Sequence, residues 1–348
     1  MKYTYSDEVR PSRRGMYRGI PRGYRRITAL LISAALLLSA CSGLPKERDL
    51  SFTDTMFDTV ISVRILDASD SQVLNGCKNL CQKYDSLLST TVEGSDIYRI
   101  NNAGGAPVEV SDETITLIKK GIYYSKMSDG AFDITIAPVS RLWDFTAEAA
   151  SVPAPENIAE AASHVNYETI IIRDNTVTLS DPAAGIDLGA IAKGYIADRL
   201  KDYLTEQGIR HALINLGGNV LAMGGKLDGS DYNIAIQKPF AESGEPITSV
   251  KISDKSVVTS GIYQRYFKAD GTIYHHILDP NTGYPCENSL YSVTIITDSS
   301  LTADALSTTC FLLGYENGMK LVNQLDNVDA IFITTDNQLH YSENFLNK

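Results

Sequence analysis

Residues 186–194 read Ile-Asp-Leu-Gly-Ala-Ile-Ala-Lys-Gly, an apolar stretch interrupted by one acid, two glycines and one lysine. Apolar residues continue at helical spacing as far as Gly208, which predicts a helix over 190–207. Asp187 and Gly189 would then lie at the helix start, where free N–H groups and the helix dipole favour anions, and Lys193 adds a full positive charge. The stretch therefore predicts a phosphate site. Simple N-capping by Asp187, with a solvated Lys193, fits this segment equally well.

The N-terminus has the pattern of a secretory signal. Eight Lys or Arg residues lie within residues 1–26, an apolar run follows over 27–38, and small residues precede Cys41. This order predicts a bacterial lipoprotein signal over 1–40, with Cys41 as the lipidated first residue and 41–50 as a tether. An uncleaved anchor is the alternative. The prediction implies an extracytoplasmic protein held at the cell membrane by its lipid.

The charge balance limits the partners. Eight of the 31 basic and two of the 42 acidic residues lie in the predicted signal, which leaves 308 residues with 23 basic and 40 acidic side chains. A strongly acidic chain makes a nucleic-acid partner improbable, so we expect none. To bind an anionic ligand, such a chain needs a local positive field, and the charge balance therefore favours a bound metal ion near Lys193.

Residues 51–348 have the patterns of a globular domain. Strands are expected at 59–66, 169–173, 212–216, 232–236, 256–259, 291–297 and 330–334. Helices are expected at 70–88, 112–127, 190–207 and 303–313, with Ser111 and Thr302 as caps. Adjacent strands over 211–297 argue against strict βαβ alternation, so we predict an α+β fold with a mixed, largely antiparallel sheet and flanking helices. A doubly wound fold is the second choice. Cys77 and Cys81, four residues apart, are expected to face the core without a disulfide.

The segment Thr302-Ala-Asp-Ala-Leu-Ser-Thr308 carries oxygen ligands on a predicted helix. Asp304 and Thr308 are four residues apart and share a helix face, with Ser307 beside them. A carboxylate and hydroxyl groups are hard ligands of the kind that Mg²⁺ binds. The alternative is that Asp304 stabilises the helix start and Thr308 packs.

A histidine pair precedes a turn in Tyr274-His-His-Ile-Leu-Asp-Pro-Asn-Thr-Gly283. Asp-Pro-Asn-Thr-Gly is typical of a rigid turn, and a histidine fixed beside such a turn is a candidate general base. The alternative is a strand pair bonded to the backbone. Three glycine-containing patches, at 130–135, 215–219 and 259–261, would allow close backbone approach.

Six motifs in this order resemble the ApbE family, the FAD:protein FMN transferases, which are often bacterial lipoproteins. The motifs are GAFDIT at 130–135, IDLGAIAKG at 186–194, INLGGN at 214–219, TSG at 259–261, HILDPNTG at 276–283 and TADALST at 302–308. The resemblance assigns FAD contacts to Ala131, Phe132, Asp133, Asp187, Lys193, His276 and Ile277. One motif departs from the family pattern, because Phe57 stands where the family has methionine, and this leaves a contact from Met56 open.

The resemblance also implies that Mg²⁺ is bound by Asp304, Ser307, Thr308 and the backbone carbonyl of Ala190. The implied reaction attacks the FAD pyrophosphate with a threonine hydroxyl of an acceptor flavoprotein, which leaves FMN in phosphodiester linkage and releases AMP. Such chemistry depends on positioning and charge neutralisation, together with a base for the hydroxyl proton. We assign that base to His276.

The resemblance suggests a membrane respiratory subunit, exposed outside the cytoplasm, as the acceptor. Two other functions use the same residues. Water in place of threonine would make the protein an FAD pyrophosphatase that yields FMN and AMP. A flavin-binding carrier lipoprotein would hold FAD without turnover.

Overall fold

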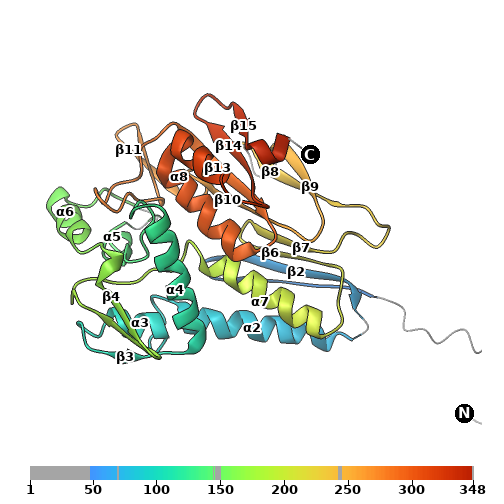
Figure 1. Ribbon diagram of the computed structural model, residues 1–348, viewed down its shortest axis with the longest axis horizontal. Helices are drawn as coiled ribbons and strands as arrows, with labels where there is room; N and C mark the ends of the chain where they lie inside the picture. The colour runs from blue at the N-terminus through green and yellow to red at the C-terminus, as the bar shows by residue number, and fades with distance from the viewer. Residues whose placement is uncertain (1–47, 69, 144, 146–149, 242–244, 347–348) are drawn as a thin grey trace, which may run out of the picture. The chain divides into compact units, whose positions relative to one another are not determined.

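An eight-stranded sheet forms the centre of the fold in the computed structural model, which describes residues 48–68, 70–143, 145, 150–241 and 245–346. The strand order is β1-β2-β6-β7-β10-β13-β14-β15, and every neighbouring pair is antiparallel (Figure 1). These strands are β1 (Arg48–Met56), β2 (Thr59–Ala68), β6 (Ala212–Leu216), β7 (Asn219–Met223), β10 (Ser256–Gly261), β13 (Leu290–Thr297), β14 (Asp329–Thr334) and β15 (Leu339–Tyr341). This arrangement confirms the predicted α+β class.

Three helices pack against one face of this sheet: α2 (Gln72–Leu88), α7 (Ala192–Glu206) and α8 (Ser300–Val322) (Figure 1). A hairpin of β8 (Tyr232–Gln237) and β9 (Pro246–Ile252) covers part of the other face. Successive residues of β14 therefore enter different cores, with Phe332 facing the helices and Ile331 facing the hairpin. Burial on both faces makes β7 and β14 almost continuously apolar, as expected for central strands.

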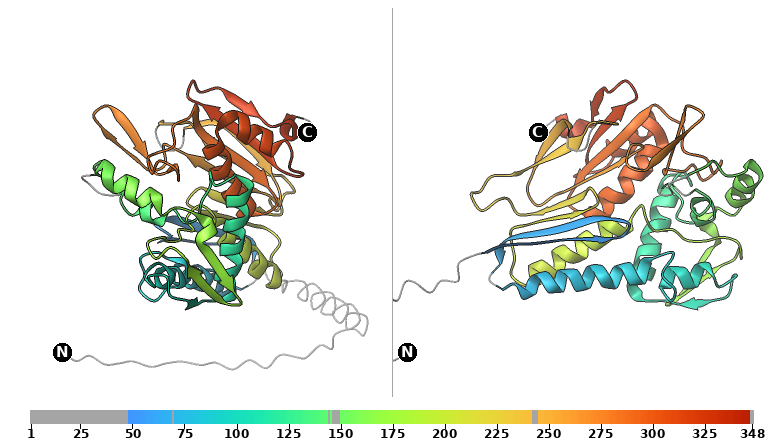
Figure 2. Two further views of the ribbon diagram at one scale, coloured as in Figure 1. Left: turned by 60° about the vertical axis from the view of Figure 1, so that its left-hand side comes forward. Right: turned by 180° about the vertical axis from the view of Figure 1, so that it is seen from behind.

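Smaller elements surround one end of α8 and α4 (Asp112–Met127) (Figure 2). They are α3 (Asp96–Asn101), β3 (Val108–Glu109), α5 (Ala137–Ser140), α6 (Pro155–Ser163), η1 (Tyr167–Thr169), β4 (Ile170–Arg173), β5 (Thr176–Leu179) and the hairpin of β11 (Tyr266–Ala269) and β12 (Thr272–His275). The short α9 (Glu343–Leu346) instead packs against β14. Trp143 joins α5, α6 and the β11–β12 hairpin, since it stacks on Tyr274 at 5.7 Å between ring centroids. This packing fixes the hairpin that carries the histidine pair.

The helix predictions are confirmed for α2, α4 and α7 to within two residues. Ser111 caps α4 as predicted, because its side chain accepts a hydrogen bond from the Thr114 N–H. The cap predicted at Thr302 is wrong, and so is the alternative in which Asp187 caps the helix. Ser299, not Thr302, caps α8, and α7 begins after Ile191, so Asp187 lies in the preceding loop. A further difference is that α8 continues beyond 313 to Val322, past a non-helical Gly314.

Cys77 and Cys81 are buried on the inner side of α2, as predicted, and both are free thiols. Strand β1 begins at Arg48, so the last residues of the predicted tether over 41–50 are part of the sheet. The predicted signal over 1–40 and the lipidation residue Cys41 lie outside the described residues. Within the described ranges, no helix has the length and apolar character needed to cross a bilayer.

Candidate active site

Helices α7 and α8 cross at Gly194, where the chain has no space for a side chain. A Cβ at this position would lie 2.3 Å from the Ser300 carbonyl oxygen and 2.7 Å from the Asp304 Cβ. Glycine therefore allows the two backbones to meet. The Gly194 N–H, one of the unpaired donors in the first turn of α7, donates to Asp304 Oδ2 at 2.8 Å. The opening motif of the sequence is thereby joined to the last one.

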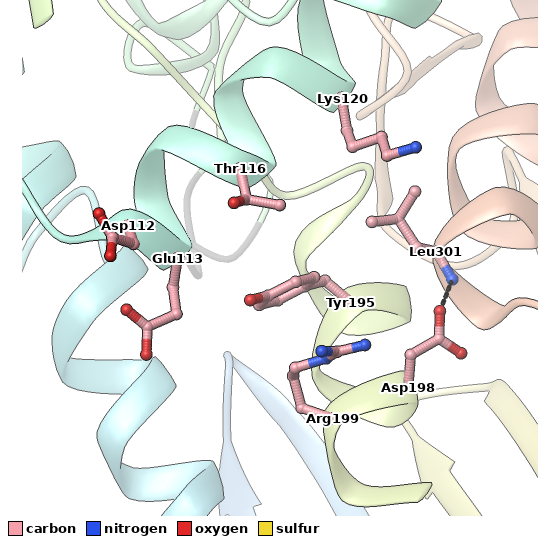
Figure 3. Close-up of a pocket in the computed structure, with 8 residues that line it drawn as sticks. All are labelled: Asp112, Glu113, Thr116, Lys120, Tyr195, Asp198, Arg199 and Leu301. Atoms are coloured by element: carbon pink, nitrogen blue, oxygen red, sulfur yellow. Dashed lines mark hydrogen bonds between the residues drawn. The ribbon is translucent and has the colours of Figure 1, made fainter. Parts of the chain in front are cut away.

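A second link fixes the start of α8 against α7. Asp198 accepts hydrogen bonds from the Ser300 N–H at 2.8 Å and the Leu301 N–H at 3.1 Å (Figure 3). Its carboxylate lies beside a surface hollow of about 340 Å³ between α4, α7 and the start of α8. None of the predicted FAD or metal residues lines this hollow. Asp198 has a structural role, because it holds the start of the helix that carries Asp304.

Asp304 is a buried acid, with only 4% of its surface exposed. Burial raises its pKa, whereas the charge of Lys193, the Gly194 N–H and the Asn219 amide act in the opposite direction. No ion pair to Asp304 is found in the part of the chain that the structure describes. A carboxylate buried in this way favours a cation beside it.

Three hydroxyl groups gather beside Asp304. Ser260 Oγ lies 2.8 Å from Ser307 Oγ and 2.9 Å from Thr308 Oγ1. The predicted residues Ser307 and Thr308 are thus brought together with Asp304 on one face of α8. Ser260, on β10, was not predicted as a site residue, because only the tertiary pairing of β10 with α8 reveals it. The TSG motif at 259–261 was the available signal.

The loop before α7 holds the remaining predicted residues of the opening motif. Asp187 accepts from the Gly189 N–H at 2.8 Å and from Ser140 Oγ at 3.0 Å, and Lys193 Nζ donates to the Gly189 carbonyl at 2.9 Å. Because the Gly194 N–H turns to Asp304, the Ala190 carbonyl lacks the partner that a continued helix would provide. This carbonyl is consequently available to a ligand.

His276 lies beside Arg265, which follows β10 in the chain. Its Nδ1 is 3.2 Å from the Arg265 carbonyl oxygen, and Arg265 Nη2 donates to the Asp58 carbonyl at 3.0 Å in the β1–β2 turn. A carbonyl only accepts, so Nδ1 carries the hydrogen and Nε2 keeps its lone pair. Burial, then the charge of Arg265, lowers the pKa of His276, and His275 and Lys193 add to the effect. His276 is therefore a neutral imidazole.

The charge of Lys193 acts to lower the pKa of both His276 and Asp304. Lys193 directly precedes Gly194, whose N–H donates to Asp304. The GAFDIT residues contribute differently. Both carboxylate oxygens of Asp133 are occupied, by the Thr135 N–H and hydroxyl and by the Tyr167 N–H, and Phe132 is buried against Tyr124. The side chains of Phe132 and Asp133 therefore stabilise the conformation of the loop that follows α4.

Ala131 and Ile277, the two remaining predicted FAD contacts, have apolar side chains and lie in different parts of the fold. Ala131 is partly exposed at the end of the turn after α4, and its N–H donates to the Ser128 carbonyl. Ile277 is buried, and its carbonyl accepts from the Cys286 N–H. Neither residue offers a polar side chain, so any contact they make with a ligand uses the backbone or an apolar surface.

The donor set fits magnesium. Within the described residues there is no cluster of three His, Cys, Asp or Glu side chains, as transition-metal sites require. Mg²⁺ needs fewer protein ligands, since it is held by one or two carboxylates together with water and substrate phosphates. The buried Asp304 carboxylate, the hydroxyls of Ser307 and Thr308 and the unpaired Ala190 carbonyl are hard oxygen donors of that type.

The structure is that of an α+β protein in which the lysine-bearing start of α7 meets the buried carboxylate of α8. The family model of the ApbE family matches residues 57–332. The chain belongs to the ApbE family, as its six motifs had indicated.

Known relatives cover nearly the whole chain. An FAD:protein FMN transferase of Klebsiella pneumoniae (strain 342) is 38% identical over 296 residues, which are 84% of this chain and 92% of that protein. The FAD:protein FMN transferase of Treponema pallidum is 32% identical over 345 residues, 93% and 95% of the two chains.

Solved structures agree with this assignment. The ApbE protein of Thermotoga maritima superposes with a TM-score of 0.79 at 31% identity, over 86% of this chain and 98% of its own. The flavin transferase ApbE of Vibrio cholerae gives a TM-score of 0.76 at 29% identity, over 86% and 99%.

Proposed function

We propose that this chain is an FAD:protein FMN transferase that moves FMN from FAD to a threonine hydroxyl of an acceptor flavoprotein. The threonine oxygen forms a bond to the phosphorus on the FMN side of the pyrophosphate. The bond from that phosphorus to the bridging oxygen breaks, and AMP leaves. The observation that supports the proposal is the hydrogen bond from the Gly194 N–H to Asp304 Oδ2 at 2.8 Å, which joins the lysine-bearing start of α7 to the buried carboxylate of α8.

The neutral His276 supplies the base. Its Nδ1–H is held by the Arg265 carbonyl, so Nε2 accepts the threonine proton as the hydroxyl attacks. The low pKa keeps the imidazole unprotonated before the reaction. Lys193 and the N-terminus of α7 stabilise the negative charge of the pyrophosphate and of the departing AMP.

Magnesium is the proposed metal. Asp304, Ser307, Thr308 and the Ala190 carbonyl would hold it, and Asp304 would bring the negative charge that the cation requires. When bound, Mg²⁺ neutralises pyrophosphate charge. In a chain with this excess of acidic residues, a local cation is needed to admit an anionic substrate.

Asp304→Ala tests the proposal against the two alternatives. We expect transfer to an acceptor protein to fall by roughly 100-fold or more, because the proposed metal loses its only carboxylate ligand. Treatment of the unmodified chain with EDTA should have the same effect. Asp298→Ala, an exposed aspartate just before α8, is the matched control and should transfer normally.

Each alternative has its own signature in that experiment. If the protein were a flavin carrier, the wild-type chain would release no AMP from FAD, and Asp304→Ala would lose only FAD affinity. A pyrophosphatase would release AMP at the same rate with and without the acceptor. Transfer by Asp304→Ala at more than about a third of the normal rate would contradict the assigned role of Asp304.

The acceptor and location are proposed on the sequence pattern. A lipid on Cys41 would hold the enzyme at the outer side of the cell membrane, where a membrane respiratory subunit with an exposed threonine would be the acceptor. Cys41→Ala should move the protein from the membrane fraction to the soluble fraction. Continued membrane association of that variant would contradict lipid anchoring.

A further inference from the structure

Asn219, the last residue of the INLGGN motif, is not among the residues that act in the proposed reaction. It begins β7 after a turn in which Gly217 and Gly218 have positive φ angles of 65° and 91°. Only 1% of its surface is exposed. A fully buried amide needs hydrogen-bond partners for both of its polar atoms, so its surroundings indicate what it does.

The amide oxygen of Asn219 is held by two buried serines. Ser300 Oγ donates to Asn219 Oδ1 at 2.6 Å, and Ser256 Oγ lies 2.9 Å from Ser300 Oγ. Ser256 belongs to β10 and Ser300 is the first residue of α8, so the amide is fixed from both elements. With Oδ1 on Ser300, the Nδ2 group must point elsewhere.

Asn219 Nδ2 is buried and has no hydrogen-bond partner among the described residues. Ser300 and Asp304 are four residues apart on α8 and share a helix face, so Nδ2 is directed towards Asp304. The lowering effect of Asn219 on the Asp304 pKa agrees with this direction.

The Gly194 N–H donates to Asp304 Oδ2 at 2.8 Å, and the Asn219 amide is directed towards the same carboxylate. Its hydroxyl neighbours lie further along α8, where Ser307 and Thr308 contact Ser260. A carboxylate that accepts a hydrogen bond at one oxygen keeps further lone pairs for another ligand. Groups that hold a metal ligand in this way are part of many metal sites.

We propose that Asn219 is a positioning residue, whose Ser300-held amide fixes the Asp304 carboxylate in the orientation in which it serves as the metal ligand. The inference rests on the proposed function, since it assigns Asn219 to the same site. It gives the INLGGN motif a physical purpose. The glycine turn places Asn219, Ser300 orients it, and Asn219 orients Asp304.

The test compares Asn219→Ala with Asn215→Ala in the full chain. Asn215 lies in the same hairpin and supports the turn by accepting from the Gly218 N–H, so its loss loosens the hairpin without touching Asp304. Calorimetry with MgCl₂ measures Mg²⁺ affinity in the presence of FAD, and flavin fluorescence measures FAD affinity in EDTA. Steady-state assays give kcat and the KM for the acceptor.

We expect Asn219→Ala to weaken Mg²⁺ binding by roughly 10- to 100-fold and to lower kcat at fixed Mg²⁺. FAD affinity in EDTA and the acceptor KM should stay within about threefold, since neither depends on the orientation of Asp304. Unchanged Mg²⁺ affinity in Asn219→Ala would overturn the inference. An equal loss in Asn215→Ala would overturn it too, because hairpin loosening would then explain the effect.

If Asn219→Ala does not fold, Ser300→Ala decides the matter, because it keeps the amide but removes the group that orients it. Weaker Mg²⁺ binding in Ser300→Ala supports the inference, and normal binding overturns it. The proposed function fails by a different result, namely a wild-type chain that binds FAD and Mg²⁺ but transfers no FMN. The Mg²⁺ comparison does not depend on transfer, so the two failures are distinguishable.

Discussion

At the scale of single residues, His276 is the proposed general base. Its tautomer is set by the Arg265 carbonyl, and its pKa is lowered by burial and by neighbouring positive charges. The same arginine holds the β1–β2 turn through the Asp58 carbonyl. Arg265 therefore links the base to the hairpin in which Phe57 departs from the family pattern.

The His276→Ala variant should lose transfer activity. We expect the single-turnover rate to fall by roughly 100- to 10,000-fold, the range attributed to a positioned general base. FAD binding should persist, because Lys193 and the α7 N-terminus are untouched. A rate near that of the unmodified chain would remove His276 from the role. His164→Ala, which loses a surface histidine paired with Asp181, is the control.

The pH dependence of the reaction follows from the lowered pKa of His276. A base acts only when unprotonated, and a pKa below the usual 6.5 preserves the unprotonated form as the pH falls. The kcat/KM for FAD, which reports the free enzyme, should therefore show no acid limb of this histidine between pH 5 and 8. A loss of activity centred near pH 6.5 that disappears in His276→Ala would contradict the assigned environment.

Residue patterns predicted part of this site and missed the rest. Asp304, Ser307 and Thr308 were predictable because helical spacing alone places them on one face. Ser260 and Arg265 were not, because their contacts with α8 and His276 depend on how β10 and the β11–β12 hairpin pack. Asn219 was visible only as part of a glycine-rich patch, since its role depends on Ser300, 81 residues away.

At the scale of elements, the crossing of α7 and α8 assembles the site. Gly194 brings the two backbones together, and Asp198 fixes the start of α8 through two backbone N–H groups. Both contacts join the opening motif to the last one. The packing of α7 against α8 therefore sets the position of Asp304.

Gly194→Ala should separate these helices. The added Cβ would overlap the Ser300 carbonyl, so we expect a loss of about 1–3 kcal/mol in the free energy of unfolding and at least a tenfold loss of transfer. Urea denaturation and single-turnover assays measure the two effects. Gly318→Ala crowds the Cys310 carbonyl later in α8 and is the matched control. It should lose stability but keep transfer, and equal activity in the two variants would contradict the account.

The starts of two helices differ from the predicted ones for physical reasons. Thr302 and Ser299 are both acceptable cap residues, and the choice of Ser299 is supported by Asp198, which accepts from the Ser299 hydroxyl and from the next two N–H groups. The helix α7 starts later than predicted for a related reason. Asp187 forms a local turn with the Gly189 N–H instead of capping the helix.

At the scale of the whole molecule, the main sheet separates two hydrophobic cores, one under the helices and one under the β8–β9 hairpin. The antiparallel sheet was predictable because most of its central strands are bounded apolar runs without helices between them. Strands such as β7 and β15 were missed. The first is a short apolar run directly after a turn, and the second has only three residues. Their assignment depends on pairing partners that local patterns do not specify.

The most direct test of the account is mass spectrometry of an acceptor flavoprotein after incubation with the full chain, FAD and Mg²⁺. We expect one FMN attached to a threonine of the acceptor and one AMP released for each FMN attached. Omission of Mg²⁺ should abolish both products. Two results would contradict transfer as the function of this site. In one, AMP is released but no FMN is attached to the acceptor; in the other, FAD stays bound and intact.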